Sequence, residues 1–508
     1  MNDNPATTRG VQFPEVDGQR STTATGRAVF ADAARPIDPD LAERITRAPK
    51  WRTSYLGYVR DLLAAELADP LGGAAVPGAG LDSLYDRMEF IRDGESLRLD
   101  RAVGAFDTPA LRTVTVEGEA AARPDGLRVP YRGQQLGGDA LRAQLRDWVD
   151  RGIVEPSFVE AIELVIANPD WLDLADQRFV LLGAGAEMGP LESLCAWGAE
   201  VVVLDRPRPH IWESILAAVR AGTGRAQVPV PIDAAADADL ADVAGTDLIT
   251  ALCEVALWLG EFEGPVTIGN HVYADGATNV QVSMAVDALI VDVGARDPRT
   301  RLAVLATPTD VFAVPEEVVA DAQRRHAEAS RVWPRVARTV SREKLYVPNY
   351  EDCVVTTPSG RRAGVADVLV AQQGPNYVLA KRLHRWRAHA MRAAGHHASI
   401  NVAPATATRS VMKNRILAAA YRAANRFGVE VFAPDTSNTL MAALLVHDLR
   451  NDKSSASPDV TLDHPQELLS EAAAHGGLWR MPFAPRSVLP LAAIRGLLPG
   501  AAGRRSSM

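Results

Sequence analysis

Short apolar runs alternate with amphipathic stretches from residue 177 to about residue 435. Six of these runs are strand candidates: RFVLLGAG (178–185), AEVVVLD (199–205), PVTIGNHVY (265–273), RLAVLAT (301–307), SINVAP (399–404) and VEVFAP (429–434). Their unbroken apolar character is typical of parallel strands that are covered on both faces. Because strands alternate with helical stretches, the pattern predicts an α/β fold class with a doubly wound parallel sheet.

The chain on either side of this segment follows other patterns. Residues 41–176 are predicted to form a mainly helical N-terminal extension, with helices at 41–50, 55–67, 141–152 and 158–167 and a Gly/Pro-rich loop at 70–80. Residues 1–40 show little periodicity and are predicted to be a flexible arm without chemistry. An insertion at about 310–365 interrupts the central segment. Residues 436–508 form a C-terminal extension with helix-like stretches at 438–449 and 464–477.

Composition excludes several classes of protein. The chain has 508 residues, a formal charge of -9 and no concentrated run of Lys or Arg, so nucleic acid is not expected as a partner. Its three cysteines, Cys195, Cys253 and Cys353, are far apart, which argues against a disulfide framework or a cysteine zinc site. No apolar run reaches the ~18 to 20 residues of a membrane span. The polar start lacks a secretion signal, so we expect a cytoplasmic protein that acts on a small molecule, and the sequence leaves a homo-oligomer open.

A glycine-rich turn follows the first strand candidate. Gly183, Gly185 and Gly189 stand where a buried strand must turn into a helix, and Met188 is the first apolar position of that helix. Glycine lets the backbone approach a pyrophosphate, and helix N–H groups would face the phosphates. The next strand candidate ends in Asp205. Together these features predict a dinucleotide site of the Rossmann type.

Asp205 and its neighbours also bear on which nucleotide is bound. An acidic side chain accepts hydrogen bonds from ribose hydroxyls and repels the extra phosphate of NADP, so NAD is slightly favoured. Arg206 and Arg208 keep NADP open as a cofactor. Two other interpretations stand beside this one. The glycines could make a tight turn without any ligand, or the turn could serve a methyltransferase that binds S-adenosylmethionine.

Tyr377 and Lys381 lie one turn apart on one face of a helix predicted to run to about residue 394, and His384 shares that face. The ammonium group would favour the phenolate and lower the pKa of Tyr377, as acid/base chemistry near neutrality requires. The nearly opposite face carries Leu379, Leu383, Trp386 and Ala390. One face of the helix can therefore pack while the other reacts. Taken alone, the pair also fits an ordinary solvated helix face.

The order of these motifs resembles the short-chain dehydrogenase/reductase family. In that family a YxxxK helix is followed by a strand reading approximately NxVAPG and by a loop that contains threonine. Here the helix segment YVLAK is followed by ASINVA (398–403) and PATAT (404–408). The resemblance covers roughly residues 178–432, about half of the chain. It implies an NAD(P)-dependent oxidoreductase in which Tyr377 donates and accepts the proton, while Lys381 lowers the pKa of Tyr377 and holds the nicotinamide ribose.

The resemblance also implies contacts between other residues and the cofactor. Asp233 would reach the adenine, Asn270 would lie against the cofactor, and Thr406 or Thr408 would meet the nicotinamide carboxamide. The remaining cofactor-binding candidates are the glycines of the turn together with Met188, Asp205, Arg206 and Pro404.

The family's substrate-orienting serine has three candidates in this chain. Thr307 and Thr309 end a strand candidate where the family carries a serine, and Ser359 is nearer to Tyr377 in sequence. A threonine hydroxyl can hydrogen-bond a carbonyl in the same way as a serine hydroxyl. Asn279 would fill the family's structural asparagine role. A core or capping role stays open for each of these four residues.

The chain departs from the family pattern at two places. The family's glycine pattern is usually GxxxGxG, whereas this turn lacks the last glycine and adds Pro190, and the insertion before Tyr377 is several times longer than usual. The predicted reaction is hydride transfer between nicotinamide and a carbonyl or alcohol carbon. The alternatives are an epimerase or dehydratase with resident NAD and a catalytically inactive nucleotide-binding regulatory protein. The histidines lack the spacing of a helical zinc site, so no metal is expected.

Overall fold

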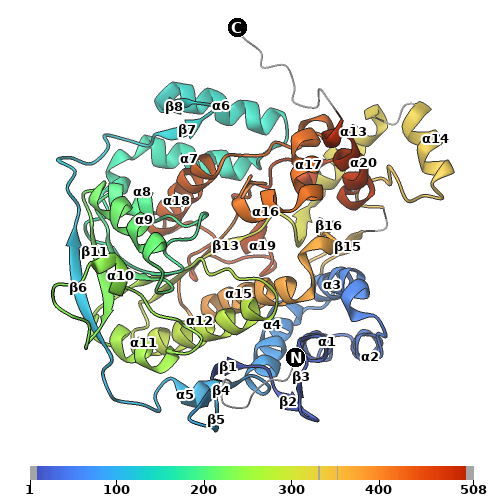
Figure 1. Ribbon diagram of the computed structural model, residues 1–508. Coiled ribbons are helices and arrows are strands. Elements are labelled where there is room, and N and C mark those ends of the chain that lie inside the picture. The colour runs from blue at the N-terminus through green and yellow to red at the C-terminus, as the bar shows by residue number, and fades with distance from the viewer. Residues whose placement is uncertain (1–8, 330–331, 352, 499–508) are drawn as a thin grey trace.

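A seven-stranded sheet forms the centre of the protein. The computed structural model describes residues 9–329, 332–351 and 353–498. In spatial order the strands are β17 (Ala398–Val402), β13 (Arg301–Ala306), β12 (Thr267–Asn270), β9 (Arg178–Leu182), β10 (Glu200–Leu204), β11 (Arg225–Pro231) and β6 (Leu111–Glu117). The first six are parallel, and β6 pairs with β11 in the antiparallel sense at one edge (Figure 1). The edge strand β6 comes first in the chain; the parallel part then starts at β9, adds β10 and β11 on one side, and crosses over to β12. This order is compatible with a Rossmann-like α/β fold.

Alternate residues of the strands enter two different hydrophobic cores. In β9, Val180 and Leu182 pack into one cluster, and Phe179 and Leu181 into the other. The first cluster includes α11 (Leu252–Leu259), α12 (Ala277–Arg296) and α15 (Pro375–Ala393), and the second includes α8 (Leu191–Ala196), α9 (Pro209–Arg220) and α18 (Pro434–Arg450). The unbroken apolar runs are thus explained, because both faces of each central strand are covered.

Five of the six strand predictions are confirmed, and the one at 429–434 is wrong. Only Phe432 of that segment pairs, as an isolated bridge with Thr406. The Phe432 N–H donates to Ala405 O, and Ala407 N–H donates to Phe432 O. Pro434 then begins α18, so there is no room for a further strand beside β17.

Residues 22–34 form helix α1, so the prediction of a flexible arm is wrong for this part of residues 1–40. The Ser21 hydroxyl accepts a hydrogen bond from Ala24 N–H at the start of α1, and Val29 and Phe30 are fully buried. The same part of the chain also forms strand β1 (Gly10–Gln12) and the start of helix α2 (Pro39–Thr46). Phe30 packs against Trp386 of α15, 6.0 Å between ring centroids. The polar composition of the segment concealed its short apolar stretch. Residues 1–8 of the predicted arm lie outside the described residues.

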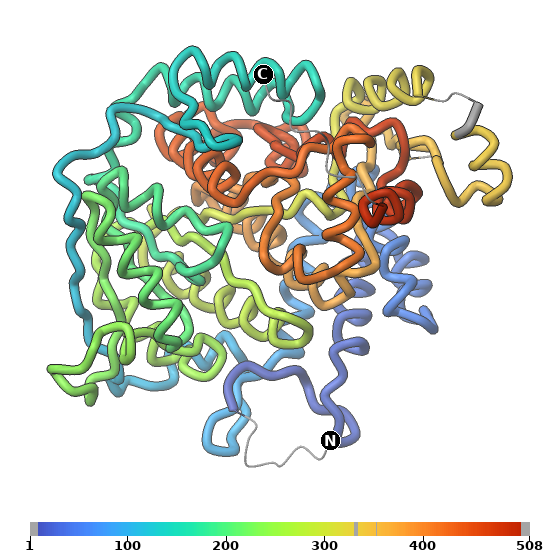
Figure 2. Tube along the Cα trace, turned by 45° about the horizontal axis from the view of Figure 1, so that its top comes forward, coloured from blue at the N-terminus to red at the C-terminus, as the bar shows by residue number. Residues whose placement is uncertain are grey.

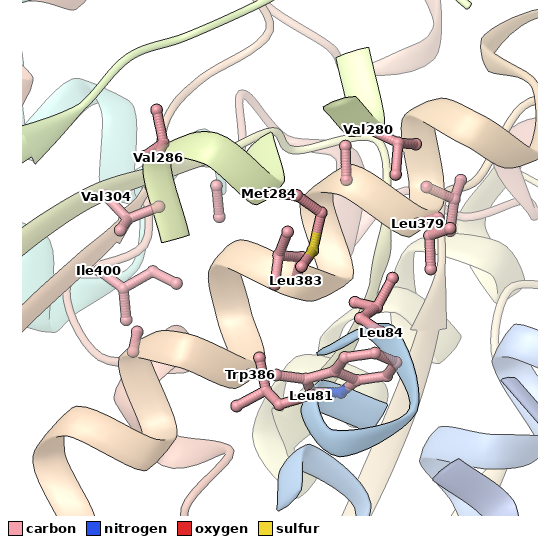
Figure 3. Packing of buried hydrophobic residues seen from close by; sticks show 14 of the residues in the cluster. Leu81, Leu84, Val280, Met284, Val286, Val304, Leu379, Leu383, Trp386 and Ile400 are labelled. Carbon is pink, nitrogen blue, oxygen red and sulfur yellow. The ribbon is translucent and has the colours of Figure 1, made fainter. Parts of the chain in front are cut away.

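The Gly/Pro-rich segment predicted as a loop at 70–80 is instead most of helix α4 (Gly72–Tyr85), with Pro77 inside it. A Cβ at Gly80 would lie 2.4 Å from the Trp386 ring, and a Cβ at Gly73 would lie 2.5 Å from Pro465. These glycines allow close helix packing, which outweighs their low helix propensity. Figure 3 shows Leu81 and Leu84 of α4 against Trp386 of α15, which confirms the predicted packing face of that helix.

The other predicted N-terminal helices are confirmed. They are α2, α3 (Trp51–Ala68), α6 (Gly138–Asp150) and α7 (Pro156–Ala167), and a short α5 (Leu99–Ala102) is added to them. Small antiparallel pairings lie between them: β1 with β4 (Glu89–Arg92) and β5 (Glu95–Arg98), β2 (Glu15–Val16) with β3 (Gln19–Arg20), and β7 (Val129–Tyr131) with β8 (Gln134–Leu136). The N-terminal helices α1 and α4 pack on α15, so they cover the helix that carries the Tyr/Lys pair.

The insertion before Tyr377 builds a small sheet of its own. Its elements are β14 (Val311–Pro315), α13 (Glu316–Ala329), α14 (Val332–Val340), β15 (Val354–Thr356) and β16 (Arg362–Asp367). The strand order is β14, β16, β15, all antiparallel. Helix α13 packs against β14 and β16, whereas α14 (yellow) lies at the outer edge of the protein in Figure 2. Residues 330–331 and 352 of the insertion lie outside the described residues.

The chain after β17 contributes mostly helices. They are α16 (Arg409–Lys413), α17 (Arg415–Ala423), α18, α19 (Glu467–Ser470) and α20 (Pro485–Leu497), with 3-10 turns at Ala424–Phe427 and Leu478–Arg480. Earlier in the chain, a short helix α10 (Leu240–Val243) lies between β11 and β12. The helix at 438–449 is confirmed as part of α18. At 464–477 only α19 is helical, because His475 and Gly477 hydrogen-bond within a tight turn beside buried Glu155. Residues 499–508 lie outside the described residues.

In the described part of the chain, no helix combines the length and apolar character needed to cross a membrane. Within the same residues, no cluster of His, Cys, Asp or Glu side chains could hold a metal ion. A homo-oligomer and a cytoplasmic location stay predictions.

Candidate functional site

A cavity of about 1190 Å³ opens at the carboxyl ends of the parallel strands. Gly183 follows β9, Asp205 follows β10, Asn270 ends β12, Thr307 follows β13 and Ala403 follows β17, and all five line the cavity. The chain order reverses between β9 and β12, and open α/β sheets bind ligands at such a point. The volume exceeds the ~300–1,000 Å³ that is usual for a small-molecule site, so there is room for two molecules.

The glycine turn lies at one end of this cavity. Gly183 has φ +82°, and a Cβ there would lie 3.0 Å from the backbone of His271. A Cβ at Gly185 would lie 2.7 Å from the Ile211 side chain. Both glycines are therefore required by protein contacts alone, and they also keep the cavity wall free of side chains.

Asp205 joins the glycine turn to the end of β10. One carboxylate oxygen accepts Gly185 N–H at 2.8 Å, and the other accepts Arg206 N–H at 2.7 Å. A carboxylate can accept about four hydrogen bonds, so Asp205 keeps lone pairs for hydroxyl groups of a ligand. Arg206 and Arg208 line the same end of the cavity.

The rest of the turn differs from the predicted phosphate loop. Gly189 does not line the cavity, and its N–H donates to Ala186 O at 2.8 Å. Met188 and Glu187 do line it. The Glu187 carboxylate accepts Arg409 N–H at 2.8 Å and has the Arg409 guanidinium at 3.5 Å, so it ties the turn to the loop after β17. Helix α8 begins only at Leu191 and has six residues, which places its N-terminus beyond the turn.

Tyr377 and Lys381 of α15 both line the cavity. The Lys381 ammonium lies 5.9 Å from the centroid of the Tyr377 ring, within cation–π range. The predicted juxtaposition is therefore present in the structure, on the same cavity as the glycine turn. The ring of Tyr273 meets Tyr377 edge-on, 6.1 Å between centroids, and closes one side.

The surroundings of Tyr377 favour its protonated phenol. Burial raises the pKa of Tyr377 to about 12, and the Asp310 carboxylate acts in the same direction. Hydrogen-bonding contacts with the side chains of Thr307 and Gln373 lower the pKa but do not offset burial. The expected lowering by Lys381 is thus absent here, because the ammonium lies over the ring. Tyr377 is a proton donor in this form.

Thr307 and Thr309 lie beside the phenol, whereas Ser359 does not line the cavity. The two threonine hydroxyls are 3.1 Å apart, and Gln373 Nε2 donates to Thr309 Oγ1 at 2.9 Å. Ser359 is exposed and hydrogen-bonds to Thr357 at 2.9 Å, on the outer hairpin of the insertion. Among the three candidate hydroxyls, Thr307 is the one in contact with Tyr377.

Lys381 lacks a neutralising partner among the described residues. Burial lowers the pKa of Lys381 to about 8, although the Asp310 carboxylate raises it in part. The ammonium charge also acts on two buried histidines. For His271, burial lowers the pKa to about 4 and Lys381 lowers it further, and the pKa of His384 is held well below its ordinary value by the same two causes, with His271 adding to them. Both histidines are therefore neutral, and His384 lies away from the cavity instead of sharing the reactive face.

A buried ion cluster fixes α15 against the loop that carries Thr307. Asp310 accepts hydrogen bonds from Arg382 at 2.5 Å and from Arg385 at 3.1 Å, and all three side chains are buried. Gln466 links Arg385 to Glu66 of α3, with distances of 3.0 and 2.7 Å. The cluster therefore holds the threonine loop and the Tyr/Lys helix in one position.

Besides Gly189, Ser359 and His384, two more predicted residues, Asp233 and Asn279, do not line the cavity. Asp233 is exposed in the loop after β11, and Asp247 lines the cavity in the region where Asp233 was expected. Asp247 comes after the short helix α10, which displaces the loop outward. Asn279 is buried in α12, where its Oδ1 accepts Ala274 N–H at 3.1 Å. Asn279 therefore shapes the loop after β12 without reaching the cavity.

The loop after β17 reaches the cavity as predicted. Pro404, Thr406 and Thr408 all line it. The Thr406 hydroxyl is already used, because it bonds to Pro404 O at 2.9 Å and to Ser437 Oγ at 2.7 Å. Thr408 Oγ is exposed and lies 3.1 Å from Ser410 Oγ, so Thr408 has the more accessible hydroxyl.

Several functional residues have no motif that would have identified them. Gln373 precedes Tyr377 by four residues, and this spacing was a usable signal for a contact near the helix start. Glu187, Asp247 and Tyr421 line the cavity through tertiary packing alone. Asp310 ends the TPTD segment, but its arginine partners are more than 70 residues away in sequence.

Comparison of the chain with protein-family models, with curated proteins and with solved structures finds no match in any of the three. The chemistry of the cavity therefore has to be argued from its own residues.

Proposed function

We propose that this protein is an NAD(P)-dependent oxidoreductase with a doubly wound Rossmann core, acting on a carbonyl or alcohol substrate. The observation that carries the proposal is one shared cavity that holds both the glycine turn with Asp205 and the Tyr377/Lys381 pair. These groups are about 170 residues apart in sequence, so their meeting at the strand ends is not a local effect. Crevices at this position of open α/β sheets bind nucleotides.

The residues present fit a dinucleotide. The side-chain-free turn at Gly183 and Gly185 and the spare lone pairs of Asp205 suit an adenosine ribose. At the other end, Lys381 supplies an unpaired ammonium that can donate to ribose hydroxyls. The negative charge of Glu187 is unfavourable to a pyrophosphate, but Arg409 already partly neutralises it through its guanidinium group and its N–H. Asp205 favours NAD, and Arg206 with Arg208 keeps NADP open.

A bound nicotinamide would supply the hydride. The Tyr377 phenol, protonated in this structure, donates the proton to the substrate oxygen during reduction and takes it back during oxidation. Thr307 contacts the phenol and can hydrogen-bond the same substrate oxygen, and Gln373 orients the pair through Thr309. Lys381, with its pKa of about 8, is mostly cationic at neutral pH, so its ammonium group can donate to the ribose hydroxyls of the dinucleotide.

A catalytically inactive nucleotide-binding protein is the second candidate. Its support is the phenol, whose pKa is raised by burial to about 12 where catalysis by a phenolate would need it lowered. Glu187 in the glycine turn also supports this second candidate, because its negative charge is unfavourable to a pyrophosphate.

Titration calorimetry against NAD, NADH, NADP, NADPH and S-adenosylmethionine tests the proposal. We expect one of the two dinucleotide pairs to bind, and Lys381→Met to weaken that binding at least tenfold. Lys453→Met, which removes an exposed lysine, should leave it unchanged. Binding of S-adenosylmethionine alone, or of none of the five, would reject the proposal. A carbonyl screen with bound dinucleotide separates the enzyme from the inactive protein.

A further inference from the structure

The far end of the cavity is an apolar chamber that none of the proposed chemistry uses. Its walls come from α17, α20 and the two 3-10 turns at Ala424–Phe427 and Leu478–Arg480. Every cavity-lining residue between 417 and 492 is apolar, except for the hydroxyl of Tyr421. Leu417, Ala420 and Ala424 come from one side, and Met481, Val488 and Leu489 from the other.

The chamber is continuous with the reacting end. Tyr421 of α17 lines the same cavity as Tyr377. Burial raises the pKa of Tyr421 to about 12, and Tyr377 contributes to this rise, so the two phenols are close enough to interact. A molecule whose carbonyl lies at Tyr377 would therefore extend its remaining atoms past Tyr421 into the chamber.

Small residues hold the chamber walls together. Helices α17 and α20 lie side by side in both overall views, and a Cβ at Gly496 of α20 would lie 1.8 Å from Ala419 O of α17 (Figures 1 and 2). The contact between the helices is built from Ala419, Ala420, Ala492 and Ala493. The backbones therefore touch, which makes the pair a fixed wall, while Ala420 and Ala492 leave free space on the cavity side.

We infer that the substrate carries an extended apolar chain, and that the chamber between α17 and α20 binds this chain while the carbonyl or alcohol carbon lies at Tyr377. The inference rests on the proposed function for the position of the reacting carbon. A chamber whose lining is apolar apart from one hydroxyl cannot repay the desolvation of charged or strongly polar groups, whereas a hydrocarbon chain gains ~0.8 kcal/mol for each methylene buried, about fourfold in affinity. Affinity should therefore rise with chain length until the chamber is full.

The test uses the full chain and no dinucleotide. Binding of cis-parinaric acid is followed by its fluorescence, and 1-butanol, 1-hexanol, 1-octanol and 1-decanol compete for the site. We expect one probe per chain and displacement constants that fall about fourfold per methylene. Equal displacement by 1-butanol and 1-decanol, or no binding of the probe, overturns the inference.

Two filling variants locate the site. Leu417→Trp and Leu489→Trp enlarge side chains that line the chamber from opposite helices, and each should weaken probe binding at least tenfold. Ile416→Trp and Ile494→Trp are matched controls on the same helices, because both isoleucines are more than half exposed and neither lines the cavity. The controls should bind within twofold of the original protein. Filling variants that bind as the original does would overturn the placement.

The two proposals fail differently. If chain-length dependence holds but no dinucleotide binds, the chamber stands and the oxidoreductase proposal falls. If dinucleotides bind and carbonyl compounds are reduced with equal kcat/KM for butanal and decanal, the chamber inference alone falls.

Discussion

Helix α15 carries two sets of ionisable side chains that differ in how they are neutralised. Tyr377 and Lys381, in its first two turns, line the cavity and lack an ion-pair partner among the described residues. Three buried or half-buried arginines follow them: Arg382 and Arg385, which pair with Asp310, and Arg387, which pairs with Asp287 at 2.7 Å. Among the charged side chains of this part of α15, Lys381 thus lines the cavity beside Tyr377, whereas the arginines are paired within the protein interior. His384 is buried away from the cavity, and neither of its ring nitrogens has a hydrogen-bond partner in the described part of the chain.

The arginine set determines where α15 lies, and the unpaired set provides the groups that can exchange protons. Breaking a buried ion pair is strongly destabilising, so the arginine set fixes where α15 lies. Tyr377 and Lys381 lose solvation without gaining an ion pair, and their pKa values shift as a result. The pKa of Tyr377 rises, which favours the neutral phenol, and the pKa of Lys381 falls, which weakens the binding of its ammonium proton. Groups in such surroundings are typical of sites that exchange protons with a ligand. Removing Tyr377 or Lys381 should therefore lower activity or binding without lowering stability. Removing the counter-charge of the arginines should lower the free energy of unfolding.

The largest effect is expected for Tyr377→Phe. General acid/base groups contribute ~10²–10⁴-fold to a rate, so kcat should fall by about this factor while dinucleotide affinity changes little. The fold should persist, because the ring and its packing against Tyr273 are kept. Steady-state kinetics and calorimetry on the same preparation measure both quantities. Tyr273→Phe is the matched control, since its hydroxyl donates a hydrogen bond to Asp275 two residues away. An equal loss in both variants would contradict the assignment.

Asp310→Ala should be the most damaging change to stability. It leaves Arg382 and Arg385 buried without a counter-charge, and breaking such a cluster costs ~3–5 kcal/mol. Urea unfolding followed by fluorescence gives the free energy of unfolding. Asp139→Ala removes a carboxylate from an exposed pair with Arg142 and should leave the unfolding midpoint unchanged. Similar midpoints for both variants would show that the buried cluster does not hold α15 in place.

Lys381→Met should stabilise the protein while it weakens dinucleotide binding. Burial lowers the pKa of Lys381 from an ordinary 10.5 to about 8, so the unfolded chain binds the proton more tightly. The cost to the folded state is complete below pH 8 and disappears as pH rises from about 8 to 10.5. The variant should gain about 3 kcal/mol at pH 7 and little near pH 10.5. Thermal unfolding at both pH values measures this, and a gain that does not depend on pH would reject buried charge as its cause.

Local pattern was enough to predict the central strands and the spacing of Tyr377 and Lys381 on α15, both of which line the cavity. The runs at 178–185 and 199–205 are covered on both faces, so their composition alone identifies them. The Tyr377/Lys381 spacing also survives in the structure, because a helix turn is a local property. The segment at 70–80 was mispredicted, since the close approach of Trp386 to Gly80 depends on residues 300 positions away.

Among the cavity residues too, those set by local pattern were predicted and those set by tertiary packing were not. Gly183, Asp205 and Thr307 were found because each directly ends a strand. Asp233 does not line the cavity, because the path of the loop after β11 is set by tertiary packing, and Asp247 lines the cavity instead. The apolar chamber could not be predicted at all, since α17 and α20 read as ordinary amphipathic or apolar helices until their packing is known.

The smallest effect is expected for Glu66, a buried carboxyl group that Gln466 links to the arginine set and that is only partly neutralised. Glu66 lies at the end of the chain Arg385, Gln466, Glu66, and burial raises its pKa from 4.5 to about 6, although the Gln466 hydrogen bond and the arginines lower it. The folded state therefore holds the proton more tightly than the unfolded chain. Stability from this group is complete below pH 4.5 and is lost as pH rises through about 6.

Glu66→Gln keeps the acceptor for Gln466 and removes the titration. We expect no change in the free energy of unfolding relative to the original protein at pH 4.5, and a gain of at most ~2 kcal/mol at pH 8, measured by urea unfolding at both values. A loss at pH 8 would mean that Glu66 acts as a counter-charge to Arg385 and Arg382. In that case the paired set extends one carboxylate further, from Asp310 through Arg385 and Gln466 to Glu66.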